Sequence, residues 1–393
     1  MHSVATRAAD APALRIAFYN NLLASHKRSH GGVRQWTLTM ANALVERGHA
    51  VDMLVEAPQS RFVDEPLLDA RVRRVILGNG IAAWLRLRQY VQQHPGVRLV
   101  AALDYYNLRA AKLKRRFGDR VHVMLTQREN LSADMAWRKP LKYWWNTLGV
   151  RRYFNRADAV VTVSKGLATD LRDNWGVAES KLHTIYNPAF RPGVLELAKQ
   201  PVDHPWFTDK RSPIVLAAGR LHYVKGFDDL LRAFALLRQR IDVRLVILGE
   251  GKEREPLTAL VESLGLADSV ALPGRVANAA AWMARADVFA LSSRREGLPA
   301  VLIEALAVGL PIVATRCPSG PDEILEADDR EARWGSLVDV GDAPQMAAAL
   351  HAALSSARPD RAVLRARAEA FSLDRALQQY LALWHVAPLA SAD

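Results

Sequence analysis

The sequence has little of several features that would identify a protein class at once. Among 393 residues there is a single cysteine, Cys317. One cysteine cannot form an internal disulfide, so nothing requires an oxidising compartment, and the cytoplasm is the simplest location. No window approaches the run of about 18 uncharged apolar residues that a transmembrane helix needs. The first residues, MHSVATRAADAPALRIAFYN, contain only a short, strand-like apolar run, which is not typical of a signal peptide.

Several binding motifs are also absent from the sequence. The stretch LGEGKERE (248–255) contains only Gly249-x-Gly251 rather than the full Gly-x-Gly-x-x-Gly of dinucleotide-binding proteins, and the P-loop pattern does not occur. There is no Asp-x-Asp and no histidine and cysteine cluster with the spacing of metal ligands. The sequence therefore gives no support to a dinucleotide enzyme, a P-loop NTPase or a metal site.

The positive charge of the chain is concentrated in its first half. Residues 1–200 hold 31 lysines and arginines against 16 acidic residues, and the remaining residues hold 22 against 25, within a net charge of +12. A one-sided excess of this kind suits an anionic surface, either a phospholipid leaflet or nucleic acid.

Short apolar runs alternate with amphipathic stretches along both halves of the sequence. Such strands, separated by helices, indicate a parallel sheet that is covered on both faces. In the first half we predict strands at 14–20, 50–55, 97–103, 121–126 and 159–164, and a helix at 33–48. In the second half we predict strands at 212–219, 243–249, 287–293 and 311–315, and helices at 227–240, 279–286 and 299–308.

The stretch between the two halves, 186–213, contains five of the 19 prolines and has a weaker periodicity. We therefore predict an α/β protein of two doubly wound, Rossmann-like domains that face each other across a cleft. The predicted parts are an N-terminal domain at 1–195, a C-terminal domain at 196–370, and an amphipathic helix at 371–393 that packs back on the N-terminal domain.

Two glycine turns lie where a strand leads into a helix. Gly31 and Gly32 follow the first strand, where backbone N–H groups and the helix dipole attract phosphate, although a simple tight turn explains them equally well. The turn AAGRLHYVKGFDDL (217–230) adds Arg220 and Lys225. These cations have the chemistry to hold a diphosphate, and ordinary exposed cations are the alternative.

The stretch REGLPAVLIEALAVGLPIVAT (295–315) places Glu296 in a loop and Glu304 one to two turns inside the helix that follows. Carboxylates accept hydrogen bonds from vicinal hydroxyls, of which a sugar nucleotide has two sets, and the amides of Gly297 and Leu298 would face the sugar or phosphate. The alternative is a cap-like Glu296 and an exposed Glu304.

These motifs together resemble a known family. The resemblance rests on GGVRQWTLTMANALVERGHAV, ADAVVTVSKGLATDL, IYNP, GRLHYVKGFDDLLRAFALL, LVILGEGKERE and EGLPAVLIEALAVGLPIVAT. Their order and spacing are similar to those of the retaining GT-B glycosyltransferases of family 4, the glycosyl transferases group 1, over roughly residues 14–385. TRCPSGPDEIL (315–325) resembles a subgroup of bacterial surface-polysaccharide and oligosaccharide assembly, often with UDP-linked sugars.

The resemblance implies a role for each matching residue. Glu304 would bind the donor ribose, and Glu296, with the amides from Gly297 to Pro299, would contact the transferred sugar. The residues implied for the rest of the donor are Arg220 and Lys225 at the diphosphate, Gly31 and Gly32 beside it, and Arg275 and Val276 at the base. The resemblance also implies a reaction without a cofactor or metal, in which the donor phosphate takes the acceptor's proton.

Other features bear on the acceptor and on partners. Where many relatives have a histidine, LTQRENLS (125–132) offers Arg128 and Glu129, and His30 precedes the glycine pair. The segment 137–154 interleaves basic and aromatic residues, which is typical either of a membrane-interfacial segment or of a core helix with a solvated basic face. We expect it to hold the protein on the cytoplasmic face of the inner membrane, near a lipid-linked or glycan acceptor. No motif supports a nucleic-acid partner.

Two alternatives to a sugar-nucleotide transferase remain at this point. A nucleotide-sugar epimerase of the GT-B fold would need no acceptor and no membrane-seeking segment. A non-catalytic membrane adaptor would not require Arg220, Lys225, Glu296 and Glu304 together.

Overall fold

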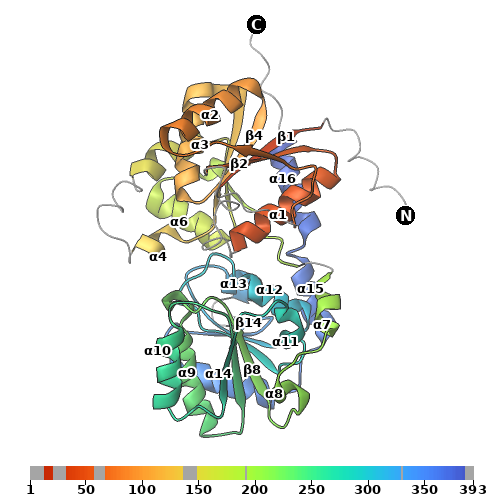
Figure 1. Cartoon of the computed structure of the whole chain (residues 1–393). Helices are drawn as coiled ribbons and strands as arrows, with labels where there is room; N and C mark the ends of the chain where they lie inside the picture. Colours follow the sequence, from red (N-terminus) through yellow and green to blue (C-terminus); the bar gives the residue numbers. More distant parts are fainter. Residues whose placement is uncertain are drawn as a thin grey trace, which may run out of the picture.

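The computed structural model describes residues 13–20, 32–56, 67–135, 148–190, 193–328 and 331–385. The described residues form two lobes, one above the other in Figure 1, each built on a parallel sheet. We call the sheet of β1 to β7 and the helices packed on it the N-lobe, and the sheet of β8 to β15 with its helices the C-lobe. The predicted boundary between 195 and 196 falls inside the helix α7, between the two sheets.

The N-lobe sheet has seven strands among the described residues, in the order β3-β2-β1-β4-β5-β6-β7. Its strands are β1 (Arg15–Tyr19), β2 (Ala50–Val55), β3 (Arg73–Ile76), β4 (Val97–Ala102), β5 (Val121–Gln127), β6 (Ala159–Thr162) and β7 (Leu182–Thr184). Its helices are α1 (Gly32–Glu46), α2 (Gly80–Gln93), α3 (Asp104–Phe117), α4 (Leu131–Met135) and α6 (Lys165–Trp175).

Strand β1 shows why the inner strands of the sheet consist almost entirely of apolar residues. Ile16 and Phe18 pack into the core on one face of the sheet, and Ala17 and Tyr19 into the core on the other. Both faces are covered by helices, so neither set of alternating side chains meets water.

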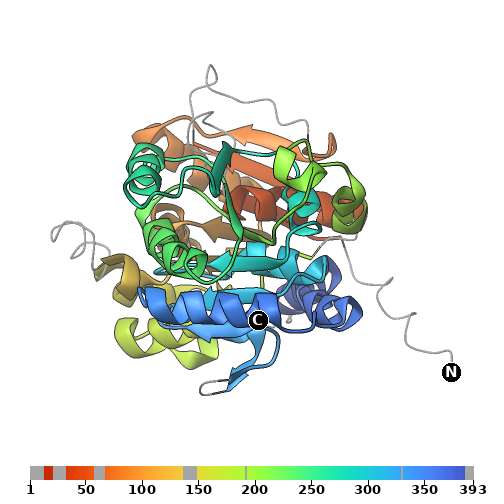
Figure 2. The same ribbon diagram turned by 90° about the horizontal axis from the view of Figure 1, so that it is seen from below.

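The C-lobe sheet has six parallel strands among the described residues, in the order β10-β9-β8-β11-β12-β15. The strands are β8 (Ile214–Ala218), β9 (Arg244–Leu248), β10 (Val270–Gly274), β11 (Val288–Leu291), β12 (Ile312–Thr315) and β15 (Ser336–Val338), with a small antiparallel pair β13 (Ala327–Asp328) and β14 (Glu331–Ala332). The helices are α7 (Gly193–Lys199), α8 (Pro205–Thr208), α9 (Phe227–Arg238), α10 (Arg254–Ser263), α11 (Ala279–Met283), α12 (Ala300–Ala307), α13 (Pro321–Leu325), α14 (Ala343–Ser355) and α15 (Arg361–Glu369). In the view from below, α14 packs beside α9 on one face of this sheet (Figure 2).

The last helix, α16 (Leu373–His385), leaves the C-lobe and packs in the N-lobe core (Figure 1). Tyr380 and Trp384 are each 1% exposed and lie in the same core as Ile16 and Phe18. The guanidinium of Arg98 in β4 donates hydrogen bonds to the carbonyl of Trp384 at 3.1 and 3.2 Å. The chain therefore crosses between the lobes twice, once before β8 and once after α15.

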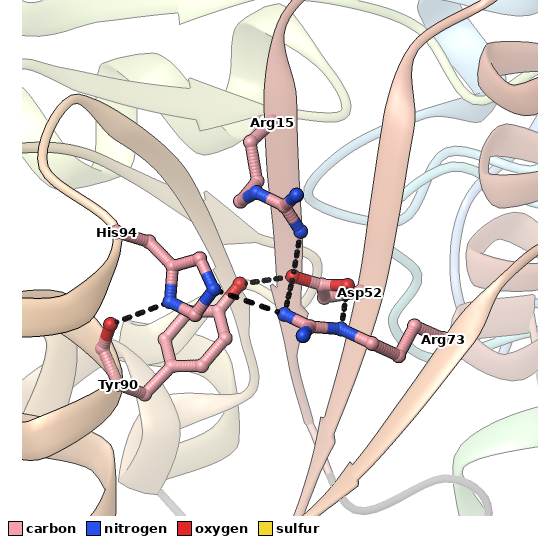
Figure 3. Close-up of polar contacts among 5 residues, drawn as sticks. All are labelled: Arg15, Asp52, Arg73, Tyr90 and His94. Atoms are coloured by element: carbon pink, nitrogen blue, oxygen red, sulfur yellow. Dashed lines mark hydrogen bonds and ion pairs between the residues drawn. The ribbon is translucent and has the colours of Figure 1, made fainter.

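One buried carboxylate lies at the end of the N-lobe sheet where the strands begin. Asp52 in β2 is 1% exposed and receives hydrogen bonds from Arg15, Arg73 and the hydroxyl of Tyr90 (Figure 3). His94 stacks on Tyr90 and bonds to Arg73. Burial raises the pKa of Asp52, but the hydrogen bonds from Arg73, Tyr90 and Arg15 outweigh it, so the pKa lies below its ordinary value.

Within the described residues, no helix combines the length and the apolar character that crossing a bilayer requires.

Candidate active site

A cavity of about 650 Å³ lies between the two lobes, and both lobes contribute to its wall. Its C-lobe side consists of residues that follow β8 and β11, and its N-lobe side includes the start of α1 and the residues that follow β5. In a parallel sheet these are the carboxyl ends of the strands, where ligands of doubly wound folds bind. The predicted cleft is therefore present in the structure.

The structure brings most of the predicted site residues into this one cavity. Those that line it are Gly32, Arg220, Lys225, Glu296, Gly297, Leu298, Pro299 and Glu304. Arg220 is exposed and forms no ion pair with any described residue, whereas Glu304, in the second turn of α12, is half-buried.

A lysine and a glutamate form the central ion pair of the cavity. Lys225 Nζ lies 2.5 Å from Glu296 Oε1, and the side chains are 21% and 11% exposed. The same Oε1 also accepts a hydrogen bond from Ser293 Oγ at 2.6 Å, whereas no described residue donates to Oε2. One carboxylate oxygen is thus held by the protein, and the other remains to accept a hydrogen bond from a ligand.

The turn after β8 and the loop after β11 are joined by several contacts. Ser292 Oγ donates to the carbonyl of Lys225 at 2.9 Å, and the amide of Arg294 donates to the carbonyl of Val224 at 2.9 Å. Gly226 lies between them with φ +59°, and a Cβ there would lie 2.1 Å from the carbonyl oxygen of Ser292. Only glycine fits this position, and it lets Lys225 reach Glu296.

Contacts between the lobes fix the width of the cavity. A Cβ on Gly297 would lie 1.9 Å from the carbonyl oxygen of Arg128, so the C-lobe loop touches the N-lobe backbone here. Glu323 of α13 accepts hydrogen bonds from the amides of Lys165 and Gly166, at 2.7 and 2.9 Å, at the start of α6. A carboxylate at a helix N-terminus is favourable, because the N–H groups there have no helical partner.

The N-lobe wall contains a buried arginine. Arg128 is 8% exposed, its guanidinium carbon lies 3.7 Å from the centroid of the Trp36 ring, and its Nη1 donates to Asn187 Oδ1 at 2.6 Å. Burial lowers the pKa of Arg128 to about 10. The guanidinium is therefore still charged at neutral pH.

Several predicted residues are not brought into the cavity. Arg275 and Val276 follow β10, the edge strand of the C-lobe sheet, and do not line it; Arg275 is exposed and Val276 packs against the core. Their proposed contact with a base stays a prediction. Gly31 and His30 lie outside the described residues.

The segment 137–154 is described only from residue 148 onward. Within the described part, Phe154 is 1% exposed and packs in the N-lobe core with Val150. The prediction that the aromatic residues of this segment face a membrane is therefore wrong for Phe154, because the hydrophobic effect places this side chain inside the protein. Arg151 and Arg152 are exposed.

Sequence reasoning missed part of the lining. The residues that line the cavity but were given no role from the sequence include Val33, Gln35, Trp36, Asn130, Asn187, Pro188, Ala189, His222, Val224, Arg295, Ala300 and Val301. Arg128 and Glu129, which the sequence offered in place of a histidine without a defined role, also line the cavity. The available signal was position, since these residues follow a predicted strand, lie in the first turn of a predicted helix, or belong to the stretch between the two halves.

Two family models match the chain. The model described as Glycosyltransferase Family 4 matches residues 30–189, and the model described as Glycosyl transferases group 1 matches residues 200–371. The first match contains the N-lobe wall of the cavity, and the second contains Arg220, Lys225, Glu296 and Glu304.

Two curated relatives are bacterial glycosyltransferases by their names. One is the N-acetylgalactosamine-N,N'-diacetylbacillosaminyl-diphospho-undecaprenol 4-alpha-N-acetylgalactosaminyltransferase of Campylobacter jejuni, 31% identical over 58% of this chain and 60% of the relative. The other is the lipopolysaccharide core biosynthesis glycosyltransferase LpsE of Rhizobium meliloti, 32% identical over 50% of this chain and 54% of the relative. The matches thus span 60% and 54% of these relatives.

Two solved structures share the fold. Sucrose-phosphate synthase from Thermosynechococcus elongatus superposes with a TM-score of 0.74 at 21% identity, over 95% of this chain and 100% of that one. HepE of Anabaena, in complex with UDP and glucose, gives a TM-score of 0.72 at 19% identity, over 95% of this chain and 100% of that one. At these identities the likeness concerns the two-lobed architecture alone.

Proposed function

The chain belongs to the glycosyl transferases group 1 and family 4 glycosyltransferases, and from this premise we propose that it transfers a sugar from a nucleotide donor to an acceptor of cell-surface polysaccharide or lipopolysaccharide assembly. The donor is a UDP-linked hexose or N-acetylhexosamine, and the acceptor is lipid-linked or a glycan. The solved relative with bound UDP and glucose supports a UDP-sugar, and the diphospho-undecaprenol in the name of the Campylobacter relative supports a lipid-linked acceptor.

The observation that carries this proposal is the arrangement of Lys225, Glu296 and Arg220 in one cleft. Lys225 and Arg220 supply positive charge where a diphosphate leaves, and Glu296 Oε2 accepts a hydrogen bond from a hydroxyl of the transferred sugar. Glu304 binds the ribose hydroxyls from the same side of the cleft. Because fixed cations stabilise the charge that develops on the leaving diphosphate, the reaction proceeds without a metal ion.

In the proposed retaining reaction, the bond between the anomeric carbon and the diphosphate oxygen breaks, and the electron pair leaves with the nucleotide. The acceptor hydroxyl forms its bond to the anomeric carbon on the same face. Its proton goes to an oxygen of the departing phosphate, and Arg220 and Lys225 hold that phosphate in place. The products are the glycosylated acceptor and the free nucleoside diphosphate.

The location follows from the acceptor. A lipid-linked acceptor is presented at a membrane, and the basic and aromatic segment 137–154 supports docking on the anionic cytoplasmic face of the inner membrane. The exposed Arg151 and Arg152 belong to this segment.

The test is nucleotide release by the purified protein with EDTA present, from UDP-, GDP- and ADP-sugars, with and without a bacterial lipid extract. We expect release from one UDP-sugar, increased by lipid and lost in Glu304→Gln. The matched control is Glu262→Gln on the exposed side of α10, which should keep full activity. Conversion of a UDP-sugar to its epimer without release would instead establish an epimerase. If no donor were turned over, the non-catalytic membrane adaptor would be the remaining hypothesis.

A further inference from the structure

Arg128 is a buried cation that has no counter-charge among the described residues. It is 8% exposed, and no carboxylate of the described residues forms an ion pair with it, although Glu129, Glu296 and Glu304 line the same cavity. Burying a guanidinium without a carboxylate is costly, because the charge loses its hydration and gains no partner charge.

The guanidinium is also incompletely hydrogen-bonded. Nη1 donates to Asn187 Oδ1, but Nε and Nη2 are sealed from solvent and have no partner among the described residues. The Trp36 ring compensates part of the charge from one face. The missing counter-charge among the described residues indicates that a group from outside the chain supplies the balancing negative charge.

The position of Arg128 in the cleft indicates which ligand supplies this negative charge. Its carbonyl oxygen touches Gly297, next to Glu296, which is proposed to contact the transferred sugar. Trp36 lies in α1, whose first residue, Gly32, lines the same cavity. The surroundings of Arg128 are therefore those of the donor, and the groups of a nucleotide sugar that match a guanidinium are oxyanions.

We propose that Arg128 attracts an oxyanion of the donor electrostatically from the N-lobe wall of the cleft, while Arg220 and Lys225 hold it from the C-lobe. The proposal rests on the proposed function, since it assumes a nucleotide-sugar donor. The oxyanion is either the diphosphate or a carboxylate on the transferred sugar. A charge in a poorly hydrated wall is weakly screened, so Arg128 attracts this group without direct contact. Arg128 is accordingly a positioning residue.

The test is calorimetric titration of the full chain, in EDTA, with UDP, UDP-glucose and UDP-glucuronate. We expect Arg128→Met to weaken binding by about tenfold to a hundredfold, the usual effect of losing a charged partner, and Arg128→Lys to restore most of it. An equal loss for all three probes assigns the diphosphate. A loss confined to UDP-glucuronate assigns the sugar carboxylate.

Thermal unfolding separates this role from a structural one. Removal of an unpaired buried charge should leave the melting temperature of Arg128→Met equal to or above that of the wild type. The control is Arg98→Met, which removes an arginine bonded to the Trp384 carbonyl and should lower the melting temperature without changing UDP affinity.

Unchanged affinities for all three probes in Arg128→Met would overturn the proposal. A lower melting temperature of Arg128→Met, together with Arg128→Lys binding no better than Arg128→Met, would also overturn it, because Arg128 would then be a structural residue. If the wild type bound none of the probes and no GDP- or ADP-sugar, the proposed function itself would have failed.

Discussion

The two ends of the N-lobe sheet differ in whether a buried charged side chain has partners. Where the strands begin, Asp52 is enclosed by Arg15, Arg73 and Tyr90, and both of its oxygen atoms accept hydrogen bonds (Figure 3). Where the strands end, Arg128 has one hydrogen bond, two nitrogen atoms without a partner among the described residues, and no ion pair with any of them.

The difference separates a network that serves the fold from one that serves a ligand. The Asp52 network needs no group from outside the chain, so its role lies in the fold. The Arg128 site lacks a counter-charge among the described residues, so it costs stability until the charge of a ligand balances it. Substitutions at the two ends should therefore change different measurements.

The largest expected effect is on catalysis, at the cleft. Arg220→Met should reduce nucleotide release by about 10²- to 10³-fold, the usual effect of removing one donor that stabilises developing negative charge. The melting temperature should stay unchanged, because Arg220 is exposed and unpaired among the described residues. Arg211→Met, at an exposed arginine paired with Asp209, is the matched control and should change neither. Full activity in Arg220→Met would remove this residue from the mechanism.

The next largest effect is on stability, at the opposite end of the sheet. Asp52→Asn should lower the free energy of unfolding by about 2–3 kcal/mol, because a neutral amide replaces the buried carboxylate that accepts charged hydrogen bonds from Arg15 and Arg73. Urea denaturation measures this loss. The KM for the donor should stay that of the wild type below the unfolding temperature. A changed KM with unchanged stability would reverse the assignment of the two ends.

A smaller effect is expected where the lobes touch. Gly297→Ala places a methyl group against the carbonyl of Arg128 and should lower the free energy of unfolding by about 1–3 kcal/mol, as overpacking does, together with donor affinity. Gly193→Ala, at the first residue of α7 with open space around it, is the control. Unchanged donor affinity in Gly297→Ala would mean that this contact does not shape the cleft.

The smallest effect concerns pH. The pKa of Asp52 is lowered in the folded protein, so its stabilising contribution is complete above the unfolded pKa of about 4 and is lost as the pH falls through the folded pKa. The difference in unfolding free energy between wild type and Asp52→Asn should therefore be constant near neutral pH and shrink below about pH 4. A difference as large at pH 3 as at neutral pH would show that Asp52 does not act through its charge.

The fold could be predicted where burial leaves an unbroken signal. Inner strands such as β1, β5 and β8 are apolar on both faces, and the sequence predicts them to within a residue or two. The edge strands β3, β7, β10 and β15 were missed, because each is only partly buried and β10 includes Pro273. A strand at the edge of a sheet is defined by backbone pairing with one neighbouring strand, and the alternation of apolar and polar side chains does not reveal that pairing.

The candidate site could be predicted only where its residues are close in sequence. Glu296 and Glu304 lie in one motif, and Arg220 and Lys225 lie in one turn, so a local pattern was sufficient. The environment of Arg128 could not be predicted, because Trp36 and Asn187 approach it only through the tertiary fold. Arg275 and Val276 show the opposite limit, since their motif matched but the edge position of β10 keeps them off the cavity wall.

The position of α16 has a consequence for how the protein is made. The N-lobe strands are synthesised first, yet one face of their sheet is covered by α1 only in part until Tyr380 and Trp384, which follow the whole C-lobe in the sequence, are synthesised. The C-lobe can complete its own core before that moment. The half of the molecule that is synthesised first is therefore finished last, and a truncation that removes α16 would expose the oldest part of the nascent chain to chaperones and proteases.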